Sequence, residues 1–441
     1  MDRLTEQAAN SRPAAKSRRK RVLDVLFVGS LPPDKGGSAV VNHLLLSGLA
    51  KAGHRVRALV PGTREVIDSG NGIASSYRGI SVSRFQLPGM ARFPVLMHAP
   101  KALRRQENEI IACALNASIA RSRPEVIVLG TEHFAWHVPD MARAARIPSL
   151  ALIQGSGNYG LLPDFPCKLR EQLLRQLRKC DVVVAVAKHL AAGMRKIGLP
   201  EVRWVANPVD CEKFKPTDRD LALLRSLKIR EDQFVVVHTS NLKRSKRALD
   251  IVRSAERVVR QCDAMYVIVG AGPMRQVMED ECERRGLRAR FRFIEWINHD
   301  RIPKYLNLAS VVLMPSESEG MALAYLEAQA CGRLLIASNI AAAREAIVDG
   351  KTGMLFRKGD IRDLAAKTLL AAREPKLRER MGREASRRVR AHSLGRFVAK
   401  YEELLQQVVV RRSVCNEIER SLQFPSDALL SRPSDGLSLR C

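Results

Sequence analysis

Short runs of β-branched residues alternate with longer stretches of helical periodicity, and this alternation restricts the fold more than any other feature. It is typical of repeated βαβ units and a parallel sheet. The runs fall into two series, which predict two sheets. The first series predicts strands at VLDVLFVGS, HRVRALVP, PEVIVLG, PSLALIQ and DVVVAVA. The second predicts strands at QFVVVHTSN, AMYVIVG, RFRFIEW, SVVLMPS and RLLIASN.

The segment NPVDCEKFKP separates the two series and breaks the periodicity with two prolines. At 441 residues the chain also exceeds the usual size of one hydrophobic core. We therefore predict an α/β protein with two Rossmann-like βαβ domains and a hinge at 207–216. The expected divisions are a basic, disordered arm at 1–21, an N-terminal domain at 22–206, a C-terminal domain with terminal helices at 207–412, and a loosely ordered tail at 413–441.

Composition argues against several classes of protein. No apolar run approaches the roughly 18 residues that span a bilayer, and no secretory signal is recognisable, so we expect a cytoplasmic protein. The nine cysteines form no C-x-x-C pair, which argues against a zinc site or a disulfide framework. The net charge of +28 would attract nucleic acid, anionic lipid or acidic saccharide. Peripheral attachment to the inner face of the plasma membrane therefore stays open.

The sharpest chemical signal is PSESEGMALAYLEAQACG, which begins at Pro315, follows a predicted strand and opens a helical segment. It contains Glu319 and Glu327. If the helix begins near Met321, its free N–H groups form an anion site that suits a diphosphate. The two carboxylates would then accept hydrogen bonds from the vicinal hydroxyls of a nucleotide sugar, Glu319 from the sugar and Glu327 from the ribose.

A carboxylate beside a diphosphate needs cations nearby. The segment HTSNLKRSKRALD follows another predicted strand and supplies Lys243, Arg244, Lys246 and Arg247. We choose Lys246, because a compact ammonium group in a strand-to-helix loop can neutralise the leaving phosphate. The alternative is that these cations are ordinary solvated helix charges.

Taken together, these segments resemble the E-x7-E signature of retaining glycosyltransferases of family 4, a large bacterial group with the GT-B fold. The resemblance extends over most of the chain and includes LPPDKGGSAV, NPVD, SNLKRSK, VGAGP, FIEWI and DGKTGMLF. It implies two domains that face each other across a cleft. The N-terminal domain would bind the acceptor and the C-terminal domain the nucleotide sugar.

The resemblance also implies roles for individual residues. Lys246 matches the donor-phosphate lysine, Glu319 the carboxylate near the donor sugar, and Glu327 the ribose-binding carboxylate. Lys246 and Glu319 are thus the expected catalytic residues. The other expected donor-binding positions are Gly36, Gly37, Asn241, Ile297, Gly320, Met321 and Ala322.

Three departures from the family pattern affect the site. Asn241 stands where many members have arginine, and Gln154 where many have a histidine that enters the acceptor cleft. A bulkier loop replaces two glycines and would narrow the sugar pocket; it consists of Ala342, Ala343, Arg344 and Glu345. Weaker candidates for contact with acceptor or sugar are His133, Gln154, Asn158 and Tyr159.

The implied activity is retaining transfer of a hexose or N-acetylhexosamine to a glycolipid, polysaccharide or small-molecule acceptor. The donor is a UDP- or GDP-sugar, with UDP favoured, and no metal or other cofactor is expected. The expected partners are the nucleotide sugar and a glycan or lipid-linked acceptor, because an aromatic content of 5% argues against nucleic acid. The alternatives are a nucleotide-sugar epimerase or glycan phosphorylase on the same fold, or a basic nucleic-acid-binding or scaffold protein with a degenerate transferase fold.

Two segments could contact a membrane surface. KLREQLLRQLRK combines a leucine stripe with cations, although a helix that covers a Rossmann sheet must bury such a stripe anyway. The burial explanation is the stronger one here. RFQLPGMARFPVLMHAPKALRR sets apolar residues between cations, and for this segment both explanations stay open.

Overall fold

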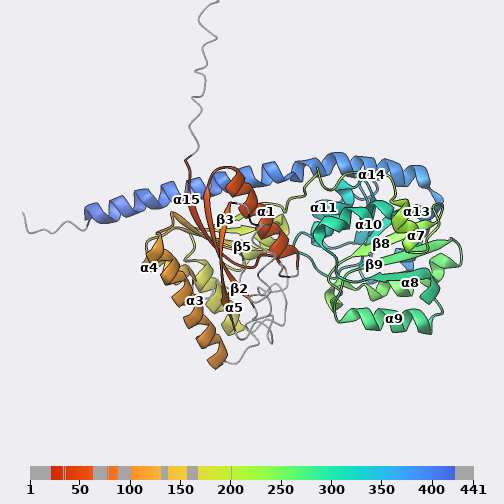
Figure 1. Cartoon of the computed structure of the whole chain (residues 1–441), viewed down its shortest axis with the longest axis horizontal. Coiled ribbons are helices and arrows are strands. Elements are labelled where there is room, and N and C mark those ends of the chain that lie inside the picture. The colour runs from red at the N-terminus through yellow and green to blue at the C-terminus, as the bar shows by residue number, and fades with distance from the viewer. Residues whose placement is uncertain are drawn as a thin grey trace, which may run out of the picture.

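The computed structural model describes residues 21–32, 34, 36–62, 77, 79–87, 101–130, 138–155, 167–199 and 201–422. Two α/β lobes lie next to each other; α14 (Pro375–Val389) lies over the second lobe, and the long helix α15 (Leu394–Leu422) continues from it over the first (Figure 1). Each lobe is built on one parallel sheet with helices on its two faces. The predicted fold class is therefore confirmed.

The first lobe contains a seven-stranded sheet in the order β3-β2-β1-β4-β5-β6-β7. Its strands are β1 (Asp24–Val28), β2 (Arg55–Gly62), β3 (Ile80–Gln86), β4 (Val126–Leu129), β5 (Ser149–Ile153), β6 (Val182–Ala185) and β7 (Val202–Trp204). Its helices are α1 (Gly37–Lys51), α3 (Lys101–Arg121), α4 (Val138–Ala144), α5 (Cys167–Leu177) and α6 (Lys188–Lys196).

The second lobe contains a six-stranded sheet in the order β10-β9-β8-β11-β12-β13. Its strands are β8 (Phe234–Thr239), β9 (Ala264–Val269), β10 (Phe291–Ile294), β11 (Val311–Met314), β12 (Leu334–Ser338) and β13 (Met354–Phe356). Its helices are α7 (Leu221–Ser226), α8 (Leu249–Val259), α9 (Met274–Arg284), α10 (Ile302–Leu308), α11 (Leu323–Ala330), α12 (Ala341–Ala346), α13 (Ile361–Arg373) and α14 (Pro375–Val389).

All ten strands predicted from the sequence are present, and three further strands, β3, β7 and β13, were not predicted. Each of these three lies at the edge of its sheet. An edge strand is covered less completely than a central one and so needs no continuous apolar run. In β3 buried and exposed positions are mixed, whereas the central strand β1 is buried at every position.

The order of the strands fixes where a ligand can bind. In both sheets the chain first winds outward from one central strand, β1 or β8, and then crosses to the other side of it. In open α/β sheets ligands bind at this switch point, beyond the carboxyl ends of the two central strands. In the second lobe these strands are β8 and β11, which pair in parallel. They are the strands that precede Lys246 and Glu319.

Helix α15 returns from the second lobe and completes the core of the first. Its residues Phe397, Tyr401 and Leu405 share one buried cluster with Val25 and Phe27 of β1. The helix continues to Leu422, beyond the end of the predicted C-terminal domain at residue 412, so the first ten residues of the expected loose tail are helical. The division of the chain into domains at residue 207 stays a prediction.

Shortening a buried side chain of α15 should destabilise the first lobe. Leu405 is fully buried, so we expect Leu405→Ala to lower the free energy of unfolding by about 2–5 kcal/mol. Val410, on the same helix, is 56% exposed and provides the control. Val410→Ala should change stability by less than about 0.5 kcal/mol. Urea unfolding measures both variants, and equal losses would contradict the assignment of α15 to the first core.

Candidate active site

Lys246 and Glu319 form the centre of the candidate site. Lys246 ends the short 3-10 turn η5 (Arg244–Lys246) that follows β8, and Glu319 lies in the loop after β11. Because β8 and β11 are neighbours at the switch point, these two loops meet. The Lys246 Nζ lies 2.6 Å from the Glu319 Oε1. The side chains are 22% and 9% exposed, so the pair is partly withdrawn from water.

Helix α11 follows the loop that contains Glu319. It starts at Leu323, two residues beyond the predicted start near Met321. The N-cap residue is Ala322, which has no polar side chain to accept from the first N–H groups of the helix. Unpaired N–H groups and the positive end of the helix dipole favour an anion at this position. A phosphate group beside Lys246 would therefore also meet the amino end of α11.

Glu327 lies on α11 and is held by residues that the sequence did not predict. Its Oε1 is 2.6 Å from the His299 Nε2, and the Nδ1 of the same ring is 3.1 Å from the Lys213 Nζ. An ammonium group only donates hydrogen bonds, so Nδ1 accepts and Nε2–H donates to Glu327. Lys213 also pairs with Asp300, at 2.5 Å. One carboxylate oxygen of Glu327 is thus engaged by His299.

The first lobe approaches this site closely at Gly320. A Cβ atom at this position would lie 2.4 Å from the main-chain oxygen of Gln154 and 3.2 Å from a methyl carbon of Val186. Both contacts belong to the first lobe. Only glycine allows the loop after β11 to pass so near to the carboxyl ends of β5 and β6.

The glycine loop of the first lobe also faces the second. A Cβ atom at Gly36 would lie 3.9 Å from the Asn241 side-chain nitrogen, and one at Gly37 would lie 3.7 Å from Leu323. Gly36 has φ +139°, a conformation that favours glycine. A small cavity at this junction is lined by Leu44 of α1 and by Leu323, Glu327, His299, Lys213 and Asp210, among others. The structure thus gathers Gly36, Gly37 and Asn241 around the carboxyl ends of the second sheet.

Gln154 is hydrogen-bonded within its own lobe through its amide nitrogen. Its Nε2 donates to the Asn42 Oδ1 at 2.6 Å and to the Gly130 main-chain oxygen at 3.1 Å. The amide nitrogen therefore stabilises the first lobe, and only Oε1 is left to accept a hydrogen bond from a ligand. Ile297 is partly buried against the core. His133, Asn158 and Tyr159 lie outside the described residues, so their predicted roles stay predictions.

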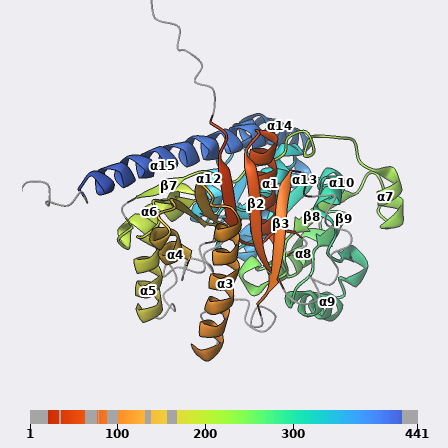
Figure 2. The ribbon, with the colours of Figure 1, turned by 60° about the vertical axis from the view of Figure 1, so that its left-hand side comes forward.

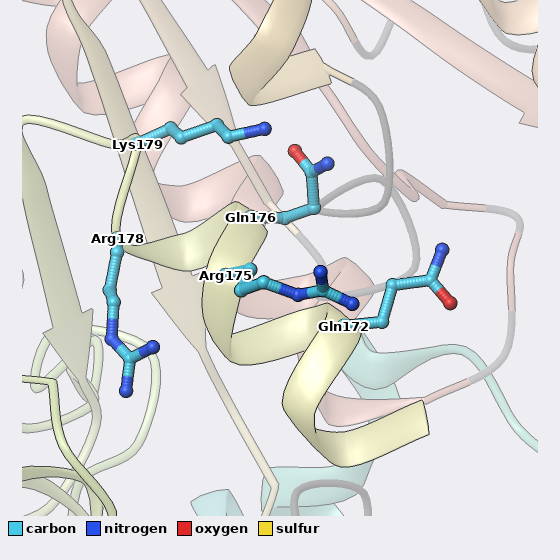
Figure 3. A pocket seen from close by; sticks show the side chains of 5 residues that line it. All are labelled: Gln172, Arg175, Gln176, Arg178 and Lys179. Atoms are coloured by element: carbon cyan, nitrogen blue, oxygen red, sulfur yellow. The ribbon is translucent and has the colours of Figure 1, made fainter. Parts of the chain in front are cut away.

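Helix α5 explains the leucine stripe of KLREQLLRQLRK. Leu173, Leu174 and Leu177 are buried in the core of the first lobe. The outer side of the helix carries a shallow hollow lined by Gln172, Arg175, Gln176, Arg178 and Lys179 (Figure 3). The stripe therefore faces the protein, as the stronger interpretation expected. Among the residues that the structure describes, no helix is both long and apolar enough to cross a bilayer. Most of the second candidate segment, RFQLPGMARFPVLMHAPKALRR, lies outside the described residues.

Two family models match the chain, one for each lobe. The model of Glycosyltransferase Family 4 matches residues 35–213, and the model of Glycosyl transferases group 1 matches residues 222–388. The chain belongs to glycosyltransferase family 4. The group 1 model covers Lys246, Glu319 and Glu327, and the Family 4 model covers Gly36 and Gly37. Membership of family 4 thus agrees with the resemblance found in the sequence.

Curated relatives in the family are similar in sequence to only part of this chain. The N-acetyl-alpha-D-glucosaminyl L-malate synthase of Bacillus anthracis is 26% identical over 53% of this chain and 61% of its own length. The D-inositol 3-phosphate glycosyltransferase of Kribbella flavida is 32% identical over 41% of this chain and 45% of its own length. The chain therefore spans only about half the length of these relatives.

A solved structure supports the fold of the whole chain. The Anabaena protein HepE, in complex with UDP and glucose, superposes with a TM-score of 0.72. The match covers 87% of this chain and all of HepE, at 16% sequence identity. At 16% identity the similarity concerns the fold alone, and it confirms the GT-B arrangement of the two lobes.

Proposed function

We propose that this protein is a retaining glycosyltransferase that moves a hexose or N-acetylhexosamine from a UDP- or GDP-sugar to a glycolipid, polysaccharide or small-molecule acceptor. The Lys246–Glu319 pair at the switch point of the second sheet is the observation that carries the proposal. UDP is the favoured nucleotide. The UDP and glucose bound to HepE support this choice.

Charge stabilisation is the proposed contribution of Lys246. Its ammonium group has three N–H donors, so it can hold the Glu319 carboxylate and a phosphate oxygen at the same time. As the glycosidic bond breaks, negative charge grows on the leaving diphosphate, next to Lys246 and the amino end of α11. Fixed positive groups aimed at developing charge lower the barrier without reorganising. They would serve here in place of a divalent ion.

Glu319 would orient the sugar by accepting hydrogen bonds from its hydroxyls. The acceptor hydroxyl would attack from the face that the diphosphate leaves, and a phosphate oxygen would take its proton, so the anomeric configuration is retained. In this scheme the protein supplies position and charge and forms no covalent bond to the sugar. Contact between the lobes would exclude water and so limit hydrolysis of the donor.

Binding of nucleotide sugars to the purified full-length protein tests the proposal. UDP-glucose, UDP-N-acetylglucosamine and GDP-mannose are titrated by calorimetry in the presence of EDTA, and slow hydrolysis of each is followed in parallel. We expect at least one donor to bind and to be hydrolysed slowly. Failure of all three in both assays would contradict the proposal. Salt-sensitive binding of RNA without any donor binding would instead favour the nucleic-acid alternative.

Loss of the carboxylate at position 327 should weaken binding of the donor more than it slows the chemical step. Hydrogen bonds to a charged group contribute about 1.5–3 kcal/mol, so we expect Glu327→Ala to raise the nucleotide Kd roughly 10-fold to 100-fold with a smaller change in kcat. Glu283 lies on the exposed surface of α9, and Glu283→Ala is the control. An unchanged Kd in Glu327→Ala would remove Glu327 from the donor site.

A further inference from the structure

Helix α6 in the first lobe begins without a cap of its own. Its N-cap residue is Ala187, which has extended backbone angles and no side-chain hydrogen bond. The first N–H groups of a helix lack partners within the helix, and a Ser, Thr, Asp or Asn at the N-cap usually satisfies one of them. Alanine cannot do this. The amino end of α6 therefore needs an acceptor from another part of the chain.

Glu345 supplies that acceptor from the second lobe. It lies on α12, which packs near α6 (Figure 2). The contact joins residues more than 150 positions apart. The Glu345 Oε2 accepts from the main-chain N–H of Lys188 at 2.9 Å, and Oε1 accepts from that of His189 at 2.7 Å. Burial opposes ionisation of Glu345, but these N–H groups and the His189 side chain outweigh it and hold its pKa below the usual value. A negative charge at this end of α6 is also favoured by the helix dipole.

His189 carries the contact onward to the candidate site. Its Nδ1 lies 2.6 Å from the Glu345 Oε1, and its Nε2 lies 3.3 Å from the main-chain oxygen of Glu319. The two ring nitrogens thus contact one group from α12 and one from the Glu319 loop. Gly320, which directly follows Glu319, is the residue whose added Cβ atom would lie 2.4 Å from the main-chain oxygen of Gln154. One imidazole thus joins the second-lobe carboxylate, the first-lobe helix and the loop that holds Glu319.

We propose that Glu345 and His189 form an interlobe clasp that sets the position of Glu319 when the two lobes meet. Both are positioning residues, because they act through the Glu319 loop. The inference rests on the proposed function, since it deepens the role of Glu319. Lys246 and Glu327 both lie in the second lobe, whereas the clasp joins the lobes. Loss of the clasp should therefore lower kcat and leave nucleotide binding nearly unchanged.

Glu345 both caps α6 and links the two lobes, and different variants separate these two functions. Glu345→Ala removes both functions. Adding Ala187→Ser gives α6 a cap from within its own lobe, so the double variant should recover thermal stability but not transfer. We expect kcat to fall by at least about 10-fold in Glu345→Ala and in the double variant, with KM for the donor changed by less than about threefold. Glu384→Ala, an exposed carboxylate of α14, is the control and should behave as the wild type.

A second variant isolates the link to Glu319. His189→Ala keeps the main-chain N–H that donates to Glu345, so the cap is preserved while the ring is lost. We expect a lower kcat without a lower Tm. If Ala187→Ser restores transfer together with stability, or if His189→Ala transfers sugar at the wild-type rate, the clasp is no more than a helix cap and the proposal fails.

Small-angle X-ray scattering gives a readout that does not depend on transfer. Without the clasp the lobes should separate, so the radius of gyration of donor-free Glu345→Ala should exceed that of the wild type. An unchanged radius would contradict the clasp even in an active enzyme. Failure of the wild type to bind any nucleotide sugar would instead contradict the proposed function, and the scattering result would still decide whether the clasp exists.

Discussion

Replacing Lys246 by alanine is expected to reduce sugar transfer by about 100-fold to 1,000-fold, the usual effect of removing one preorganised charge-stabilising group. The ammonium group lies 2.6 Å from Glu319, which precedes α11, and the leaving diphosphate would sit at the amino end of this helix. The variant also leaves the poorly exposed Glu319 carboxylate without its cation, which adds repulsion toward the diphosphate. Initial rates with a donor identified by calorimetry measure the effect.

Lys243 provides the matched control for this prediction. It lies in the same loop but is exposed, so Lys243→Ala should keep most of the wild-type rate. Lys246→Arg tests whether the shape of the cation matters, because it preserves the charge but replaces a compact ammonium group with a planar guanidinium group. We expect it to recover only part of the activity. Unchanged turnover in Lys246→Ala, or equal losses at Lys243 and Lys246, would contradict the role given to Lys246.

Gly320→Ala is expected to have a comparably large effect through geometry alone. The added Cβ atom would lie 2.4 Å from a main-chain oxygen of the first lobe, which cannot move aside as a flexible side chain would. Either the lobes separate or the Glu319 loop shifts. A displacement of about 1 Å in an active site can cost roughly 100-fold in rate. We expect a loss of that order in kcat, measured with saturating donor.

Gly395→Ala is the matched control, because it also adds a Cβ atom to a glycine but at a position with free space. A Cβ atom there would meet no other atom within 4 Å, and the residue lies near the start of α15. Gly395→Ala should therefore leave transfer unchanged and add a little helix stability. If Gly320→Ala also transferred sugar normally, the close approach of the two lobes at this loop would not belong to the active arrangement.

The sheets, and the loops that carry Lys246 and Glu319, could be predicted from the sequence because both depend on local pattern. A fully buried parallel strand needs a continuous apolar run, and all ten such runs form strands. Lys246 and Glu319 could be predicted because each follows a strand whose neighbours are fixed by the usual order of this fold. By contrast, the three-residue strands β7 and β13 are too short to form a recognisable run, and β3 mixes polar with apolar positions.

The long-range contacts between side chains around the site could not be predicted from local pattern. His299 reaches Glu327 across 28 positions, and His189 reaches Glu345 across 156. A lone histidine gives no sign of its partner in the sequence. Gln154 was placed by the resemblance near the acceptor cleft, yet its amide nitrogen is taken by Asn42 of the same lobe. The structure identifies Ala187 as the N-cap of α6 and Glu345 as the group that replaces its missing side-chain cap.

The course of α15 affects how the chain can fold during synthesis. The first lobe emerges from the ribosome long before Phe397, Tyr401 and Leu405, which cover part of its β-sheet. Until those residues are translated, the apolar side chains on that face are exposed to water or to a chaperone. The core of the first lobe is therefore completed only after the second lobe has been translated.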